Sequence, residues 1–419
     1  MAKKIVLIEV LFLLPLMICC SPALASSGFM ASYGNKVLVG QNSDGEQEDY
    51  MYLFFHPANS GKHGYLVIRF DFDHTPNPNE ELVNHAGMND QGLVIVPTSI
   101  PSRKLNAHPE KPMLNDTYLN TLLSTVSTVD QAIAVLEQYQ PHAPDFDDFE
   151  WQLLITDKLG EAVSLSVGPD GEFHISRKED NYKVITNFNV AEPSLGRHPD
   201  PRYDSATKKL EKIDSEDDIS VEYFQSVLDA IHWEGPETNT IYSNIYDPVN
   251  GLVYLYYFHQ FDEVVVLNLE EELAKGYHYY NYRALFSPDI VEKAAQEKEF
   301  NQTLNTGIMV ITLIVIALFV ILLGFGIYKT GKTEDLATKW KIVRIGAFLA
   351  VGLLGSPLLY WNGEYLAVLL SSNYFEVSDV HQPFKELMPA IDLLVIGCSL
   401  IVSLVIFIRR YGQKFLKRV

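Results

Sequence analysis

The placement of long apolar stretches along the chain constrains its fold more than any other feature of the sequence. Three such stretches lie near the C-terminal end, at residues 306–328, 345–361 and 389–408. About 20 consecutive apolar residues in a helix are enough to cross the hydrocarbon core of a bilayer. We therefore expect a membrane region at residues 304–419, with three spans, preceded by one large folded domain.

The first 25 residues are typical of a cleaved secretory signal. Lys3 and Lys4 precede an apolar run, and Ala23 and Ala25 form a small-x-small cleavage site. An uncleaved anchor helix is the alternative interpretation of this run. Cleavage after Ala25 would make Ser26 the first residue of the mature protein and would leave residues 26–303 as its folded domain.

The charges of the loops predict how the chain is oriented. Five Lys and Arg residues lie between the first and second expected spans, and five more follow the third. The loop between the second and third spans holds Lys385 together with four acidic residues. Loops rich in Lys and Arg stay in the cytoplasm. The C-terminus is therefore expected to be cytoplasmic and residues 26–303 extracytoplasmic, on the side to which a cleaved signal also leads.

Charge and cysteine content exclude several classes of function. The net charge of −21 argues against nucleic acid as a partner, because phosphate binding requires a basic surface. The three cysteines, Cys19, Cys20 and Cys398, all lie outside residues 26–303, which excludes a disulfide or a thiol nucleophile there. The acidic residues near Asp71 match no standard ligand spacing. We expect no metal and no cofactor. The sequence does not indicate an oligomeric state.

Residues 26–303 show the alternation and turn residues of a β-rich domain. Strands are predicted at 29–33, 36–40, 51–55, 65–70, 93–97, 151–156, 162–167, 173–176, 183–187, 240–245, 252–258 and 263–268, and helices at 115–123, 129–139, 205–213, 221–231 and 288–300. The strands occur in groups separated by paired helices, unlike the regular alternation of a doubly wound fold. This order predicts an α+β class, with antiparallel sheets packed together and helices outside them.

Ser26 is a candidate nucleophile if the signal is cleaved. An N-terminal serine carries a hydroxyl and a free α-amine on one residue, and the amine is partly neutral near pH 7–8. The amine can then act as general base for its own hydroxyl. The alternative is that serine is simply tolerated after a cleavage site.

Short motifs along the domain support the catalytic interpretation. They are Ser-Ser-Gly-Phe at 26–29, Val-Gly-Gln-Asn-Ser-Asp at 39–44, Gly-Met-Asn-Asp-Gln-Gly-Leu at 87–93, Ile-Thr-Asn-Phe at 185–188, Pro-Arg-Tyr at 201–203 and Thr-Ile-Tyr-Ser-Asn-Ile-Tyr-Asp at 240–247. In this order the set resembles the N-terminal-nucleophile (Ntn) linear amide hydrolases of the choloylglycine hydrolase, penicillin V acylase and acid ceramidase type, including the related penicillin acyltransferase-like proteins. The resemblance covers about residues 26–276. It implies a four-layer αββα sandwich, followed here by the three expected spans.

The resemblance also implies roles for individual residues. It implies Ser26 as nucleophile, Asp44 as the carboxylate that holds its amine, Asn187 as oxyanion donor, Arg202 as an active-site cation, and Gln41 and Ser99 as substrate-facing positions. Serine stands where the family has cysteine, and Gln41 stands where it has arginine. From the residues alone, Asp44 could equally be a turn residue, Asn187 a strand-end cap and Arg202 a solvated ion-pair partner.

These observations predict a membrane-anchored hydrolase of linear N-acyl amides, with a small acylated amide as substrate and the membrane as its surroundings. The alternative is a catalytically inactive Ntn-fold module that binds or senses such a ligand on a membrane stem. A transporter is disfavoured because Asp392 is the single acid within the three spans.

Overall fold

The computed structural model describes residues 26–46, 50–71, 83–114, 116–140, 149–195, 198–234 and 238–332. Its contacts divide the chain into two compact units, Ala23–Glu299 and a second unit formed by Met1–Pro22 and Phe300–Val419. The first unit contains every candidate site residue that the sequence analysis singled out.

Among the described residues, no helix is both long enough and apolar enough to cross a membrane. The expected span at 306–328 falls within helix α7 (Pro288–Gly331). The signal region at 1–25 and the expected spans at 345–361 and 389–408 lie outside the described residues.

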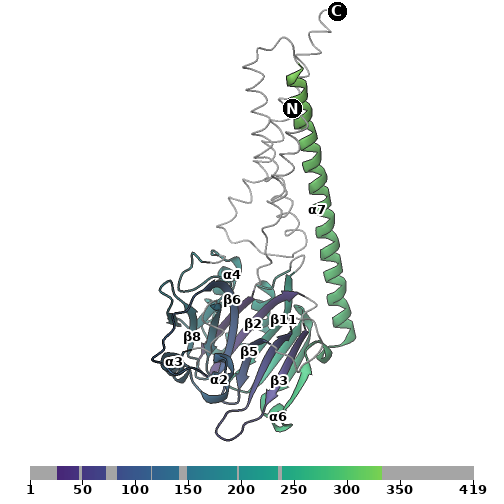
Figure 1. The fold of residues 1–419 in the computed structure, drawn as a ribbon. Helices are drawn as coiled ribbons and strands as arrows, with labels where there is room; N and C mark the ends of the chain where they lie inside the picture. The colour runs from purple at the N-terminus through teal and green to yellow at the C-terminus, as the bar shows by residue number, and fades with distance from the viewer. Residues whose placement is uncertain are drawn as a thin grey trace, which may run out of the picture. The chain divides into compact units, whose positions relative to one another are not determined.

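Two antiparallel sheets form the centre of the first unit (Figure 1). In the described chain one sheet has the order β10-β1-β2-β11-β12-β13. Its strands are β1 (Ser26–Tyr33), β2 (Lys36–Glu46), β10 (Tyr182–Ile185), β11 (Thr238–Asp247), β12 (Leu252–Tyr257) and β13 (Gln260–Asn268). The other sheet has the order β14-β3-β4-β5-β6-β7-β8-β9. Its strands are β3 (Tyr50–His56), β4 (Tyr65–Asp71), β5 (Val83–Asn89), β6 (Val94–Arg103), β7 (Phe149–Thr156), β8 (Ala162–Val167), β9 (Phe173–Arg177) and β14 (His278–Asn281).

Three apolar cores hold these sheets between two layers of helices. The largest core lies between the sheets, where Met30 and Val39 of one sheet meet Leu53 and Ile68 of the other. A second core packs helices α2 (Tyr118–Thr125) and α3 (Val129–Gln138) on the eight-stranded sheet, and a third packs α4 (Pro201–Leu210) and α5 (Val221–Ala230) on the six-stranded sheet. The first unit therefore has the four-layer αββα arrangement that the resemblance implied.

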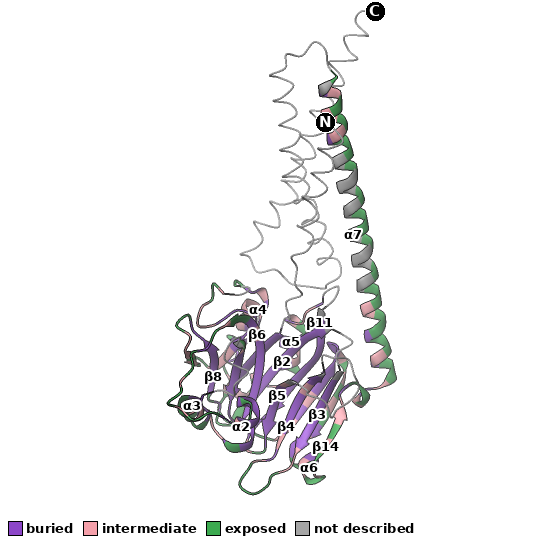
Figure 2. Ribbon diagram, viewed as in Figure 1, coloured by how far each residue is buried: buried purple, intermediate pink, exposed green. Residues whose placement is uncertain are grey.

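Covering both faces of each sheet buries the central strands almost completely (Figure 2). All six residues of β8 are buried, including Ser164 and Ser166, which alternate with apolar residues. Burial on both faces is possible for such a strand because its neighbours satisfy the backbone hydrogen bonds. The strand at 162–167 was predicted with these bounds.

Helix α4 begins at Pro201, so the predicted helix at 205–213 was placed four residues too late. The side chain of Asp200 accepts a hydrogen bond from the Arg202 backbone N–H, and Pro201 occupies the first turn. Both are favourable helix-start residues. Strands β5 and β14 and helix α6 (Leu269–Ala274) were not predicted, because their short polar sequences show no clear periodicity.

Candidate active site

Ser26 is the first residue of β1 and is buried within the six-stranded sheet. It pairs with Ser43 of β2, and its relative exposure is 2%. Side chains alternate along a strand, so Ser26 lies on the same face as Gly28 and Met30. Met30 belongs to the core between the sheets. The Ser26 side chain therefore faces the space between the two sheets.

Two glycines allow β1 to pack closely at this point. A Cβ atom on Gly28 would lie 2.8 Å from Val96 Cγ1 of the opposite sheet, and one on Gly40 would lie 2.3 Å from Phe29 Cζ. Phe29 is fully buried against Phe224 of α5, with ring centroids 5.2 Å apart. The Ser-Ser-Gly-Phe motif thus reflects packing needs on both faces of the strand that carries Ser26.

Asn187 connects Ser26 to the second sheet. Its Oδ1 accepts a hydrogen bond from the Ser26 backbone nitrogen at 2.8 Å, and its Nδ2 donates to the carbonyl of Ser99 at 2.7 Å. The side-chain amide nitrogen carries two protons, and one of them makes the bond to Ser99. Ser99 takes part through its backbone and not through its hydroxyl.

Arg202 is buried at the centre of a charged cluster behind Asn187. Its guanidinium donates to Asp44 Oδ2 at 3.1 Å, to Asp200 through two nitrogens, and to Asn187 Oδ1. The side chains of Asp44, Asp200 and Arg202 are all at most 3% exposed. The structure therefore brings Ser26, Asn187, Arg202 and Asp44 into one hydrogen-bonded chain, and Arg202 is not the solvated residue that its sequence position alone allowed.

The two carboxylates that share Arg202 differ in acidity. Burial raises the pKa of Asp44 to about 6, against the lowering effects of Arg202 and of the hydrogen bond from Thr240. Burial also disfavours ionisation of Asp200, but its contacts with Arg202 outweigh this and hold its pKa below the usual range. One guanidinium cannot fully compensate two carboxylates. Asp44 is the member that changes charge near neutral pH.

Gln41 lies opposite Gly28, on the face that Ser26 also shares. Its Nε2 and the Tyr242 hydroxyl both approach His85 Nδ1, at 3.2 and 2.7 Å. Burial lowers the pKa of His85 to about 3, so the ring is neutral, and its Nδ1 lies within hydrogen-bond distance of both groups. The buried Gln41 Oε1 has no hydrogen-bond partner among the described residues. This leaves an acceptor between the sheets, where the family has a cation.

Sequence reasoning missed three groups that support the site. Asp200 clamps Arg202, Thr240 donates to Asp44, and the backbone nitrogen of Trp233 donates to Thr240 at 2.6 Å. Asp200 could have been found as a helix N-cap before Pro201. Thr240 stood within a quoted motif, but its pairing with Asp44 across β11 and β2 depends on sheet register.

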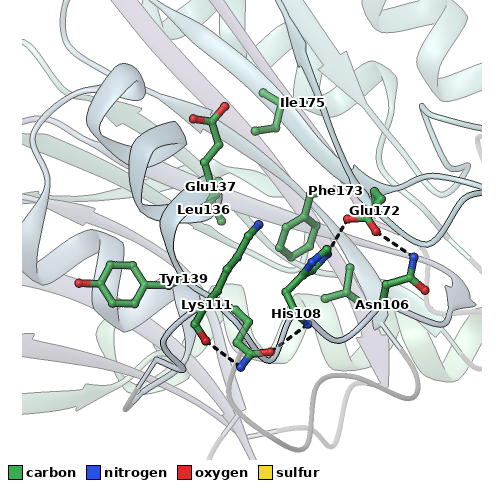
Figure 3. A pocket seen from close by; sticks show the side chains of 11 residues that line it. Asn106, His108, Lys111, Leu136, Glu137, Tyr139, Glu172, Phe173 and Ile175 are labelled. Carbon is green, nitrogen blue, oxygen red and sulfur yellow. Dashed lines mark hydrogen bonds and ion pairs between the residues drawn. The ribbon is translucent and has the colours of Figure 1, made fainter.

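A separate surface pocket of about 270 Å³ lies elsewhere in the first unit (Figure 3). His108, Glu172 and Asn106 lie along one side of it, and His108 Nε2 is 2.7 Å from Glu172. None of its lining residues belongs to the Ser26 group. Its lining holds no serine, threonine or cysteine, so we assign the chemistry to Ser26 and not to this pocket.

Comparisons with known proteins found a matching family model and several similar solved structures. A family model described as acyl-coenzyme A:6-aminopenicillanic acid acyl-transferase matches residues 32–262, which begins after Ser26. No curated protein matches the chain. The chain is similar to the structure of a conjugated bile acid hydrolase mutant from Clostridium perfringens, at 15% identity and a TM-score of 0.48 over 61% of this chain and 97% of that one. It is also similar to penicillin V acylase from Agrobacterium tumefaciens, at 16% identity and a TM-score of 0.44 over 58% and 86% of the two chains. A third similar structure is an N-acylethanolamine-hydrolyzing acid amidase ortholog from Caenorhabditis elegans, at 12% identity and a TM-score of 0.37. This match covers 57% of this chain and 99% of that one.

Proposed function

Since this chain belongs to the acyl-coenzyme A:6-aminopenicillanic acid acyl-transferase family, which is of Ntn type, we propose that it hydrolyses linear N-acyl amides with Ser26 as nucleophile. One observation carries the proposal: the hydrogen-bonded chain from the Ser26 nitrogen through Asn187 and Arg202 to Asp44. This chain joins the backbone nitrogen that would become the α-amine to a buried cation and a buried carboxylate.

The first half-reaction forms an ester on Ser26. The α-amine takes the hydroxyl proton as Oγ attacks the acyl carbon, and Asn187 Oδ1 holds that nitrogen in place. The amine then returns the proton to the leaving nitrogen as the C–N bond breaks. A second Asn187 N–H directed at the carbonyl oxygen would stabilise the oxyanion by roughly 3 kcal/mol.

The second half-reaction releases the acyl group. Water gives one proton to the α-amine and attacks the ester carbon, and the Ser26 oxygen leaves with that proton, so the carboxylic acid is formed and the enzyme is regenerated. An amine in place of water would give acyl transfer by the same steps. Gln41 Oε1 is buried and accepts no hydrogen bond from the residues that the structure describes, so it is suited to accept the N–H of the substrate amide.

A catalytically inactive binding module remains the second candidate, and one observation favours it. Asn187 Nδ2 already donates to the Ser99 carbonyl at 2.7 Å, and Gln41 supplies no cation where the family has arginine. In this case the site would bind an acyl amide without turnover, and Ser26→Ala would leave the affinity unchanged.

The surroundings of the site are also proposed from sequence. Cleavage after Ala25 would expose the amine of Ser26, and the apolar stretches at 345–361 and 389–408 would anchor the domain outside the cytoplasm. The support is the agreement between the cleavage site and the basic loops.

A serine pair offers a matched test of the mechanism. Ser26→Ala should abolish turnover of a panel of linear amides and formation of the acyl ester. Ser27→Ala is the control, because Ser27 is equally buried, pairs with Asn42 and points to the opposite face of β1. Equal loss in both variants, or turnover that survives Ser26→Ala, would reject Ser26 as nucleophile.

A further inference from the structure

A cluster of two histidines and two glutamates lies on the other side of Thr240 from Asp44. His232 and Glu234 follow α5, His259 lies in the turn between β12 and β13, and Glu297 lies on α7 within the first unit. His232 Nε2 is 2.8 Å from Glu234 Oε1, and His259 Nε2 is 3.0 Å from Glu297 Oε1. Ligand atoms of His232, Glu234 and His259 all lie within 4.8 Å of one another.

The second nitrogen of each histidine is held by a backbone carbonyl. His232 Nδ1 contacts the carbonyl of Asp229, and His259 Nδ1 lies 3.2 Å from the carbonyl of Thr240. A carbonyl can only accept, so each Nδ1 carries a proton, and each Nε2 lies at hydrogen-bond distance from a carboxylate. Metal-binding histidines are oriented in this way by their outer contacts. Two imidazole nitrogens and two carboxylates thus gather at one place, where a proton on each Nε2 or a bound metal ion balances the carboxylates.

The turn that presents His259 is built from unfavourable residues. Phe258 and His259 join β12 to β13 with φ of 51° and 47°, and Tyr257 pairs with Gln260 across the turn. Two-residue turns with both φ values positive favour Asn-Gly, since larger residues are disfavoured there. A strained histidine in this position suggests a functional requirement for its ring. The rings of His259 and His232 stack with centroids 4.5 Å apart.

We propose that His232, Glu234 and His259 bind a divalent transition-metal ion of the zinc class, with Glu297 as a fourth ligand from α7. Two neutral imidazoles and two carboxylates offer a charge of −2, which a divalent ion balances. Nitrogen donors favour zinc-class ions over Ca²⁺ and Mg²⁺, which prefer oxygen ligands. The four residues come from three elements distant in sequence, which explains why no ligand spacing is visible in the sequence.

The metal would have a structural role beside the active site. It would cross-link the start of α7 to the β12–β13 turn and to the segment after α5. Thr240 links this site to the proposed catalytic group, because its carbonyl faces His259 and its hydroxyl donates to Asp44. The ion makes no contact with Ser26 in this arrangement, so the proposal stands whether or not the protein is an active hydrolase.

Zinc titration of the full-length protein tests the proposal. After chelation and dialysis, the protein should bind one equivalent of Zn²⁺, measured by competition with a chromophoric chelator, and its melting temperature should rise on binding. His259→Ala and the near-isosteric Glu234→Gln should each weaken binding at least about tenfold, since even outer-shell changes cost 10–100-fold. If His259→Ala fails to fold, Glu234→Gln still decides the outcome.

His278 provides the matched control. Its Nδ1 also faces a backbone carbonyl, that of Gly276, and its Nε2 lies 3.0 Å from Glu272. Glu272 also pairs with Lys275, and among the described residues His278 belongs to no group of possible metal ligands. His278→Gln should leave zinc binding unchanged. The proposal is overturned if no stoichiometric zinc binds, if the site variants bind as tightly as the wild type, or if His278→Gln removes the binding. Absence of binding would identify the cluster as two protonated histidines paired with carboxylates.

Discussion

Removing the guanidinium of Arg202 tests whether the buried charge cluster is organised as described. The change Arg202→Met keeps an unbranched side chain of similar reach but deletes four side-chain hydrogen bonds, three of them to Asp44 and Asp200. Deleting one partner of a buried ion pair costs about 3–5 kcal/mol, because a charge is left without compensation. We therefore expect the free energy of unfolding to fall by about 3–5 kcal/mol at pH 8.

The free energy of unfolding that Arg202→Met loses should be larger at high pH than at low pH. Without Arg202, burial outweighs the hydrogen bonds that remain to Asp44 and Asp200, so their pKa values in the folded variant rise above those in the unfolded chain. A raised pKa gives stability at low pH that is lost as the pH rises through the folded value. In the wild type, the lowered pKa of Asp200 gives the opposite contribution, lost as the pH falls. The difference between variant and wild type should thus be smaller at pH 5 than at pH 8.

Urea unfolding followed by tryptophan fluorescence measures the change in the free energy of unfolding. Trp233 is a suitable reporter because its ring centroid lies 5.8 Å from the guanidinium carbon of Arg202. Arg177→Met is the control, because Arg177 pairs with Asp130 and Glu161 at the surface with its side chain half exposed. A surface pair contributes about 0–1 kcal/mol. A loss below about 1 kcal/mol in Arg202→Met, or a loss that does not change between pH 5 and pH 8, would refute the reasoning.

Four further predictions follow from individual contacts. For the wild type we expect kcat/KM to fall as the pH drops through about 6, and Asp44→Asn should remove this fall; an unchanged pH profile would exclude Asp44. Thr240→Val should lower the free energy of unfolding by about 1.5–3 kcal/mol, because a bond to a charged acceptor is lost, and thermal melting would show no change if that bond is absent. Gln41→Arg should lower the free energy of unfolding in urea by about 3–5 kcal/mol and give no gain in activity, since the cation would be buried beside neutral His85; a more active enzyme would contradict this. Gly28→Ala should lower the free energy of unfolding by about 1–3 kcal/mol, because the added Cβ would lie 2.8 Å from Val96 Cγ1. Adding Val96→Ala should recover part of this free energy in the double variant.

Much of the fold could be predicted from local pattern. Alternation located most strands, since a strand with a buried face must repeat every two residues. The pattern failed for β5, Val83–Asn89, where polar His85 and Asn89 are buried because Tyr242 and backbone carbonyls satisfy them. These partners are distant in sequence, so local hydropathy indicates a loop.

The site shows the same limit. Ser26, Asp44, Asn187 and Arg202 were selected by motif order, and the structure brings them together. Asp200 and Thr240 acquire their roles only through packing of α4 and through the register of β11 against β2. The cluster of His232, His259 and the two glutamates draws on three elements, so no spacing in the sequence could indicate it.

Mass spectrometry of the N-terminal peptide tests the central claim most directly. The mature protein, purified from its native membrane or secretory environment and quenched during turnover of a linear amide, should yield a peptide that begins at Ser26 and carries the acyl group on that residue. A mature protein that begins at any other residue would contradict the account. An acyl group found on Ser27 while Ser26 stays unmodified would contradict it equally.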